Sequence, residues 1–105
     1  MRKNRVSSSQ RSATFDPAKA EENFRKHRVR FEEAAAVFLD PVALTFWDPD
    51  HSDEEEREIT IGRSARRRVL FVAHTARHGG VRIINARQAI RRERRQYEQG
   101  IGAAT

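Results

Sequence analysis

The chain has 105 residues, of which 21 are Lys or Arg and 15 are Asp or Glu, so its formal net charge is +6. It contains no cysteine, which excludes disulfides, thiolate zinc sites and cysteine nucleophiles. No apolar stretch is long enough to cross a bilayer, and no apolar region follows the basic N-terminus as it would in a secretory signal. We therefore expect one small, basic, cytoplasmic domain without a membrane segment.

The positive charge is concentrated in the two terminal parts of the chain. Residues 1–13 carry four basic and no acidic side chains, residues 41–62 carry one basic and seven acidic, and residues 63–105 carry eleven basic and two acidic. Residues 1–13 lack hydrophobic periodicity, so we expect a flexible basic tail. The basic C-terminal part indicates a folded surface that attracts polyanions. Arginines that only solvate an ordinary surface are an equally good explanation.

Two helices are expected at the beginning of the domain. Asp16-Pro17 is a typical helix start, and the pattern continues to about residue 28. The residues expected to face inward are Ala20, Phe24 and His27. A second helix is expected over residues 31–39, where Asp40-Pro41 ends it.

The apolar period then changes from 3.6 to 2, which predicts a sheet. Strands are expected at residues 42–47, 58–62, 68–75 and 81–85. The third is apolar on both faces and should be central, and short links such as the turn at residues 77–80 favour an antiparallel meander. A short extra strand near Ala13 to Phe15 and a last helix at about residues 88–99 complete an α+β fold. Residues 14–99 would form the domain, followed by a disordered C-terminus at residues 100–105.

No known catalytic or phosphate-binding motif is present. The four histidines are scattered, so we expect no metal site and no cofactor. The best candidates for chemistry are His74 on the central strand, Arg82 on the next strand and Arg87 just past its end. Together on one sheet surface they could hold a phosphodiester, because arginine suits phosphate oxygens and histidine transfers protons. Alternatively, His74 is a hydrogen-bonded sheet residue and both arginines pair with Glu93 or the acidic loop.

RNA is a suitable substrate for such a set of residues, because its own 2′-hydroxyl can act as the nucleophile without a metal ion. The helix over residues 91–95 is either a solvated basic face, a surface for phosphate contacts, or the dock of an acidic partner. Phe46 and Trp47 could be a base-stacking platform, but we expect them to pack in the core.

Several short motifs occur in a fixed order along residues 13–99. They include Phe15-Asp-Pro-Ala-Lys-Ala20, Arg25-Lys-His27, Phe31-Glu-Glu-Ala34, Asp48-Pro-Asp-His51, Ile61-Gly-Arg-Ser64, His74-Thr75, Arg82-Ile-Ile84, Ala86-Arg87 and Arg91-Arg-Glu93. In these motifs the chain resembles the BrnT-type toxins. It departs from them at Arg30, where a serine usually precedes the Phe-Glu-Glu segment and would cap the second helix.

The resemblance implies a RelE-like fold, a metal-independent endoribonuclease that inhibits translation, and a type II toxin–antitoxin pair. The partner would be a BrnA-like antitoxin with a ribbon-helix-helix part, through which alone the complex would contact operator DNA and regulate its own transcription. On this hypothesis the catalytic candidates are His74, Arg82 and Arg87, and the candidates for RNA contact are Lys26, Arg91, Arg94 and Tyr97. The alternative is a catalytically inactive module that binds the antitoxin and acts as a co-repressor.

Overall fold

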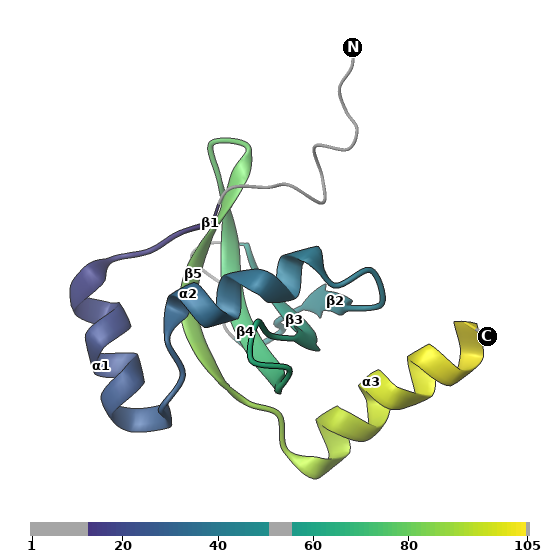
Figure 1. Ribbon diagram of the computed structural model, residues 1–105. Helices are drawn as coiled ribbons and strands as arrows, with labels where there is room; N and C mark the ends of the chain where they lie inside the picture. The colour runs from purple at the N-terminus through teal and green to yellow at the C-terminus, as the bar shows by residue number, and fades with distance from the viewer. Residues whose placement is uncertain (1–12, 51–55, 105) are drawn as a thin grey trace.

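The computed structural model describes residues 13–50 and 56–104 (Figure 1). Residues 1–12 of the expected tail and residues 51–55 of the acidic loop lie outside these ranges. In chain order the elements are β1 (Ala13–Thr14), α1 (Pro17–His27), α2 (Phe31–Ala34), the 3₁₀ helix η2 (Ala35–Leu39), β2 (Leu44–Trp47), β3 (Arg57–Arg63), β4 (Val69–Arg77), β5 (Gly80–Gln88) and α3 (Arg91–Ala104).

The strands form one mixed sheet in the order β1-β5-β4-β3-β2. Strands β2 to β5 are antiparallel neighbours in sequence order, and β4 is central, as predicted. Strand β1 adds a fifth strand that runs parallel to β5 and pairs with Val81 and Arg82. The expected short strand near Ala13 to Phe15 is confirmed, but its parallel pairing with β5 makes the sheet mixed rather than purely antiparallel. The two-residue strand β1 is too short for its hydrophobic pattern to predict a pairing with β5, which is distant in sequence.

The β4–β5 hairpin turns through two residues, His78 and Gly79, with φ of 48° and 80°. Two positive φ values match the twist of strands joined by a two-residue turn. Further along β5 the pairing shifts, because Ala73 pairs with Asn85 whereas His74 pairs with Ile83. This bulge leaves one extra residue, Ile84, in β5.

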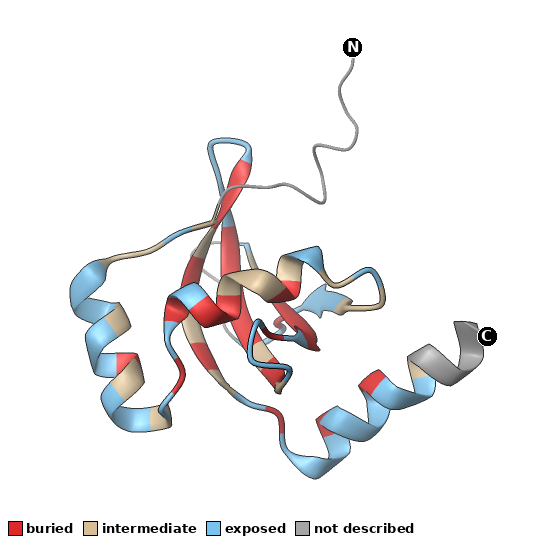
Figure 2. Ribbon diagram, in the orientation of Figure 1, coloured by how far each residue is buried: buried red, intermediate tan, exposed pale blue. Residues whose placement is uncertain are grey.

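One face of the sheet, which we call the α2 face, is covered by α2 and η2 (Figure 1). Helix α1 lies along the β5 edge of the sheet. The buried core of the α2 face consists of Val29, Phe31, Ala34, Val37, Leu70, Val72, Ile83 and Ala86. Figure 2 shows the buried residues concentrated in the central strands and α2, whereas α1 and α3 are mostly exposed. This core is the main source of stability, because each large apolar side chain contributes about 1.5–3 kcal/mol when fully buried.

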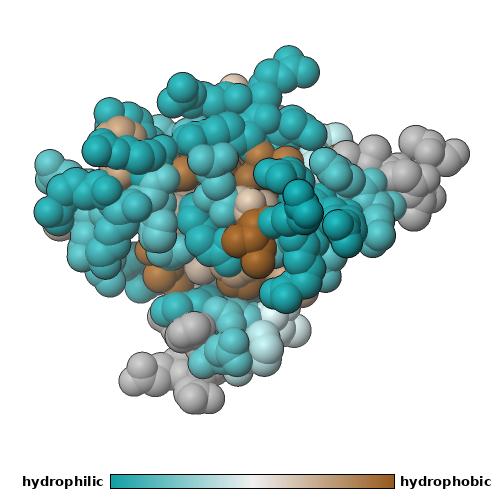
Figure 3. All heavy atoms as spheres, turned by 90° about the horizontal axis from the view of Figure 1, so that it is seen from below, coloured by the Kyte–Doolittle hydropathy of each residue, from teal (hydrophilic) through white to brown (hydrophobic). Residues whose placement is uncertain are grey.

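The opposite face, which we call the α3 face, has a smaller core. Its buried residues are Ile59, Ile61, Val69, Ala73, Ala89 and Tyr97. Helix α3 is attached to this side through two buried residues, Glu93 and Tyr97, and the rest of its first ten residues is exposed or partly exposed. Seen from below in Figure 3, the surface is mainly hydrophilic, with a few hydrophobic side chains near its middle.

The second helix differs from the expected regular helix over residues 31–39. Only Phe31–Ala34 is α-helical, and Ala35–Leu39 is a 3₁₀ helix. The N-cap residue Arg30 makes no side-chain capping bond, as expected from the missing serine. At the other end the Asp40 N–H donates to Val37 O at 3.2 Å, an i to i−3 bond that tightens the last turn.

Two expectations for the C-terminal part are corrected. Strand β5 continues to Gln88, where a helix was expected, because Gln88 still pairs with Leu70. Helix α3 begins at Arg91 and continues to Ala104 through Gly100 and Gly102, so residues 100–104 are helical rather than disordered. A glycine inside a helix costs only about 1 kcal/mol relative to alanine, which the helix tolerates.

The expected burial of Phe46 and Trp47 is wrong. Their exposed fractions are 43% and 56%, because β2 is an edge strand. The two side chains point to opposite faces, as neighbours along a strand do. Alternation of apolar residues showed that this segment is a strand but not that it lies at the edge.

Candidate functional site

Five cations from four elements line a groove at the β5 edge of the sheet. Lys19 and Lys26 come from α1, and the remaining three are Arg57 of β3, Arg77 of β4 and Arg82 of β5. The groove consists of two hollows of about 240 Å³ each, and both are lined by Lys19 and Ile84. The other lining residues are Glu22, Asn23, His27, Ile83 and Asn85. We call this site the α1–β5 groove.

The strand register brings the three arginines together. Arg57 pairs with Thr75, and Thr75 pairs with Arg82, while Arg77 lies two residues beyond Thr75. Paired residues on neighbouring strands point to the same face, so all three guanidinium groups belong to the α3 face. Their positive charges lie on one surface of the sheet, which attracts anions.

A single buried side chain, Asn23, fixes α1 to β5. Its Nδ2 donates to Ala86 O at 2.8 Å and to Val29 O at 2.9 Å, and its Oδ1 accepts from Ala86 N at 3.1 Å. The carboxamide thus satisfies both backbone groups of Ala86, as a neighbouring strand would. Hydrophobic periodicity could not identify this inward residue, because it is polar. The expected inward residues of α1 are only partly buried.

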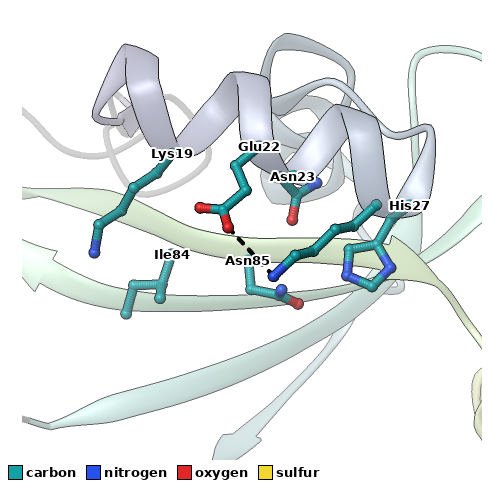
Figure 4. A pocket seen from close by; sticks show the side chains of 7 residues that line it. Lys19, Glu22, Asn23, His27, Ile84 and Asn85 are labelled. Carbon is teal, nitrogen blue, oxygen red and sulfur yellow. Dashed lines mark ion pairs between the residues drawn. The ribbon is translucent and has the colours of Figure 1, made fainter.

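The α1 side of the groove presents groups suited to acid–base chemistry (Figure 4). His27, in the last turn of α1, is partly buried and its ring lies beside Asn85. Lys26 Nζ is 3.3 Å from Glu22 Oε2, but both side chains are largely exposed, so this ion pair is weak. Imidazole can accept and donate a proton near neutral pH. The groove therefore combines cations with one group able to transfer a proton.

Three of the groove cations have no acidic partner in the described structure. Lys19, Arg77 and Arg82 form no ion pair with any carboxylate of residues 13–50 and 56–104. The planar fork of arginine matches two phosphate oxygens, and lysine adds a point charge.

His74 does not lie in this groove. It is 1% exposed on the α2 face, where its Nε2 is 2.7 Å from Thr60 Oγ1 and its ring meets Phe38 edge-to-face at 4.8 Å. Its strand partner is Ile83, whose side chain points away from the face of Arg82. His74 is a hydrogen-bonded sheet residue, which was the alternative interpretation.

Arg87 shares the α3 face with Arg82 but is used within the fold. Its Nη1 and Nη2 donate to the two carboxylate oxygens of Glu93 at 2.8 and 2.9 Å, and its guanidinium lies 3.9 Å from the centre of the Phe71 ring. Glu93 also accepts from Ile90 N at 2.9 Å. Burial would raise the pKa of Glu93, but the bonds from Arg87 and Ile90 outweigh it and hold this pKa below its usual value. The alternative pairing with Glu93 is confirmed for Arg87.

The four residues expected to contact RNA differ in accessibility. Tyr97 is 1% exposed and donates to Asp40 Oδ2 at 2.6 Å. Burial and this hydrogen bond raise the pKa of Tyr97, so it anchors α3 rather than offering a contact. Arg91 and Arg94 are exposed on α3, and Lys26 is exposed on α1.

The described residues form neither a metal-binding cluster nor a membrane-spanning helix. Within residues 13–50 and 56–104, no three His, Asp or Glu side chains gather closely enough to hold a metal ion. Among the helices described, none is long and apolar enough to pass through a bilayer.

Fold and groove together define a small basic α+β protein with a cluster of cations at the β5 edge of its sheet. A family model described as "Ribonuclease toxin, BrnT, of type II toxin-antitoxin system" matches residues 15–93. The chain therefore belongs to the BrnT family of toxins, which confirms the resemblance.

A crystal structure of the Brucella abortus ribonuclease toxin, BrnT, is similar to this chain. The TM-score is 0.59 at 23% sequence identity, over 75% of this chain and 96% of the Brucella chain. At this identity the likeness shows a shared fold. No curated protein matches the chain.

Proposed function

We propose that this toxin is an endoribonuclease that cleaves RNA in the α1–β5 groove. The observation that carries the proposal is the convergence of Lys19, Arg77 and Arg82 without a carboxylate partner in the described ranges. Membership of a ribonuclease-toxin family supports it. Fixed cations stabilise the negative charge that develops on phosphorus in the transition state.

The cleavage step uses the RNA's own 2′-hydroxyl and requires no metal ion. The 2′-oxygen bonds to phosphorus while its proton passes to His27. The bond from phosphorus to the 5′-oxygen then breaks, and that oxygen takes up a proton from water. The products are a 2′,3′-cyclic phosphate and a 5′-hydroxyl. His27 is the better candidate for proton transfer because it lines the groove, whereas His74 is buried on the other face.

Cleavage of RNA in the presence of EDTA tests the proposal. The wild type should leave 2′,3′-cyclic phosphate ends, and Arg82→Ala should lower kcat/KM by about 100-fold or more. Arg25→Ala is the control, since it removes a positive charge from an exposed position of α1 outside the groove. Full activity of Arg82→Ala would exclude the groove as the site.

A second pair of variants separates proton transfer from binding. His27→Ala should lower kcat by about 10²–10⁴-fold with a smaller change in KM. His78→Ala, in the exposed β4–β5 turn, should leave both constants unchanged. An unchanged kcat for His27→Ala would remove His27 from the mechanism.

We also propose that a BrnA-like antitoxin with a ribbon-helix-helix part blocks this groove with an acidic or amphipathic segment. RNA cleavage would inhibit translation in the absence of the antitoxin, and the complex would bind operator DNA through the antitoxin. Charge reversal at the groove, as in Lys19→Glu with Arg82→Glu, should weaken the complex. Unchanged affinity of this double variant would contradict the blocking model.

One observation favours a second function, that of an inactive antitoxin-binding co-repressor. Arg87 and His74, two residues expected to act on RNA, are used to hold the fold together. Such a module would form a tight complex with the antitoxin and bind the operator. It would neither cleave RNA nor arrest growth when expressed alone.

A further inference from the structure

A separate hollow of about 290 Å³ lies between α3 and the end of β2. Its apolar lining residues are Phe46, Pro49, Ile59 and Phe71, and its polar lining residues are Asp48, Asp50, Arg92, Glu93 and Gln96. We call it the Phe46 slot. It lies on the α3 face of the sheet, where Phe46 pairs with Ile59 and Ile59 with Ala73.

The slot is next to the α1–β5 groove. Arg57 lines the groove and Ile59, two residues further along β3, lines the slot. Side chains two residues apart on a strand share a face and lie about 6.8 Å apart along it. When the groove holds the phosphates of an RNA chain, a neighbouring base of that chain therefore comes within reach of the slot.

The apolar part of the slot offers flat surfaces for stacking. Phe46 is 43% exposed, although most large apolar side chains in this small domain are buried. Phe71 is partly buried, and the guanidinium of Arg87 lies 3.9 Å from its ring centre. Aromatic rings and guanidinium planes are surfaces on which nucleobases stack.

The slot is lined by three acidic residues and one arginine, whereas the groove is lined mainly by cations. Asp50 is an exposed carboxylate, which repels phosphate but accepts hydrogen bonds from amino groups. Adenine, guanine and cytosine carry an exocyclic amino donor, whereas uracil presents a carbonyl oxygen at the position of the cytosine amino group. The charges therefore separate the two parts of a nucleotide, with phosphate in the groove and base in the slot.

We propose that the Phe46 slot binds one base of the RNA and prefers a base with an exocyclic amino group to uracil. This proposal rests on the proposed function, because the groove supplies the phosphate contacts. Phe46 provides the stacking surface, and Asp50 accepts the hydrogen bond from the amino group.

The test measures binding of fluorescently labelled 2′-O-methyl RNA hexamers of cytosine and of uracil, which lack the nucleophile and are not cleaved. The wild type should bind the cytosine hexamer more tightly. Phe46→Ala should raise its Kd about tenfold, as expected for the loss of one stacked base. Trp47→Ala is the matched control, because Trp47 is an exposed aromatic residue of the same strand on the opposite face. It should change Kd by less than about twofold.

Asp50→Asn tests the base preference. It should reduce the ratio of the two Kd values while the affinity for the uracil hexamer is retained. Equal affinity of the wild type for both hexamers would overturn the preference. The melting temperature of each variant checks folding, and Phe46→Leu, which keeps an apolar side chain without the ring, should bind as weakly as Phe46→Ala.

The outcomes distinguish the two proposals. If Phe46→Ala and Phe46→Leu bind like the wild type while Arg82→Ala does not bind, the slot proposal is overturned and the groove stands. If Arg82→Ala binds the hexamers and cleaves RNA like the wild type, the proposed function itself fails.

Discussion

The two ends of β5 carry arginines on the same face of the sheet in different surroundings. Arg87 is paired with Glu93 and stacked on Phe71, and it holds the start of α3. Arg82 lies among other cations and has no carboxylate partner in the described ranges. A paired guanidinium stabilises the fold, whereas a cluster of cations raises its electrostatic energy and attracts anions. The role of an arginine here depends on its neighbours and not on its strand.

A second arginine, Arg68, also stabilises the fold by pairing with a mostly buried carboxylate. Arg68 donates to Glu33 through Nε at 2.9 Å and Nη2 at 2.6 Å, and Ser64 Oγ donates to Glu33 at 2.6 Å. The hydrogen bond from Arg68 is the main cause of the lowered pKa of Glu33. This network fixes α2 to the turn between β3 and β4.

The largest expected effect on stability is that of replacing Arg87, whereas replacing Arg82 should have almost none. Arg87→Ala should lower the free energy of unfolding by about 2–4 kcal/mol, because it leaves the mostly buried carboxylate of Glu93 without its partner. Arg82→Ala should change it by less than about 0.5 kcal/mol. Urea titration measures both, and equal effects would contradict the distinction. Replacing both partners, with Arg87→Met and Glu93→Leu, should recover most of the loss.

The next largest effect on stability concerns Asn23, which attaches α1 to β5. Asn23→Ala should destabilise the protein by about 2–3 kcal/mol, since three backbone groups lose a buried partner. Asn85→Ala, at a partly buried position of the same groove, should cost less than about 0.5 kcal/mol. A small effect of Asn23→Ala would show that α1 is held by its apolar contacts instead.

The buried ion pairs should also make stability depend on pH. The pKa values of Glu33 and Glu93 are lowered in the folded state, so both carboxylates stabilise the fold above their unfolded pKa of about 4.3. This contribution is lost as the pH falls through the folded pKa values. Unfolding measured between pH 3 and pH 7 should therefore show stability falling below about pH 5. Glu33→Gln should be less stable at pH 7 and should depend less on pH.

The smallest effect concerns the hydrogen-bonded chain on the α2 face. Thr60 Oγ1 lies 2.7 Å from His74 Nε2 and 2.8 Å from Thr45 Oγ1. Thr60→Val should cost about 1 kcal/mol and leave RNA cleavage unchanged. Loss of cleavage by a folded Thr60→Val protein would return His74 to the mechanism in place of His27.

Local sequence signals predicted much of the fold. The Asp16-Pro17 helix start is confirmed, because Asp16 Oδ1 accepts from Ala18 N at 2.9 Å. The central position of β4 and the β4–β5 hairpin are also confirmed. These features depend on capping, alternation and turn residues within a few positions of one another.

The candidate site was predicted less well, since only Arg82 and Lys26 of the expected residues line the groove. Asn23 is polar and does not belong to the apolar stripe of its helix, and Arg57 and Arg77 belong to strands that meet only in the sheet. The bulge at Ile84 decides which β5 residues share a face. No residue pattern within β5 alone reveals this shift, because it depends on pairing with β4.

The elements, their approximate ends, the central strand and the family of this protein follow from short-range backbone preferences and ordered motifs in the sequence. Which charges are paired and which are gathered in the groove follows from the packing of helices and strands against one another. Electrostatic interactions depend on distances across strands and helices, and those distances exist only once the sheet has formed.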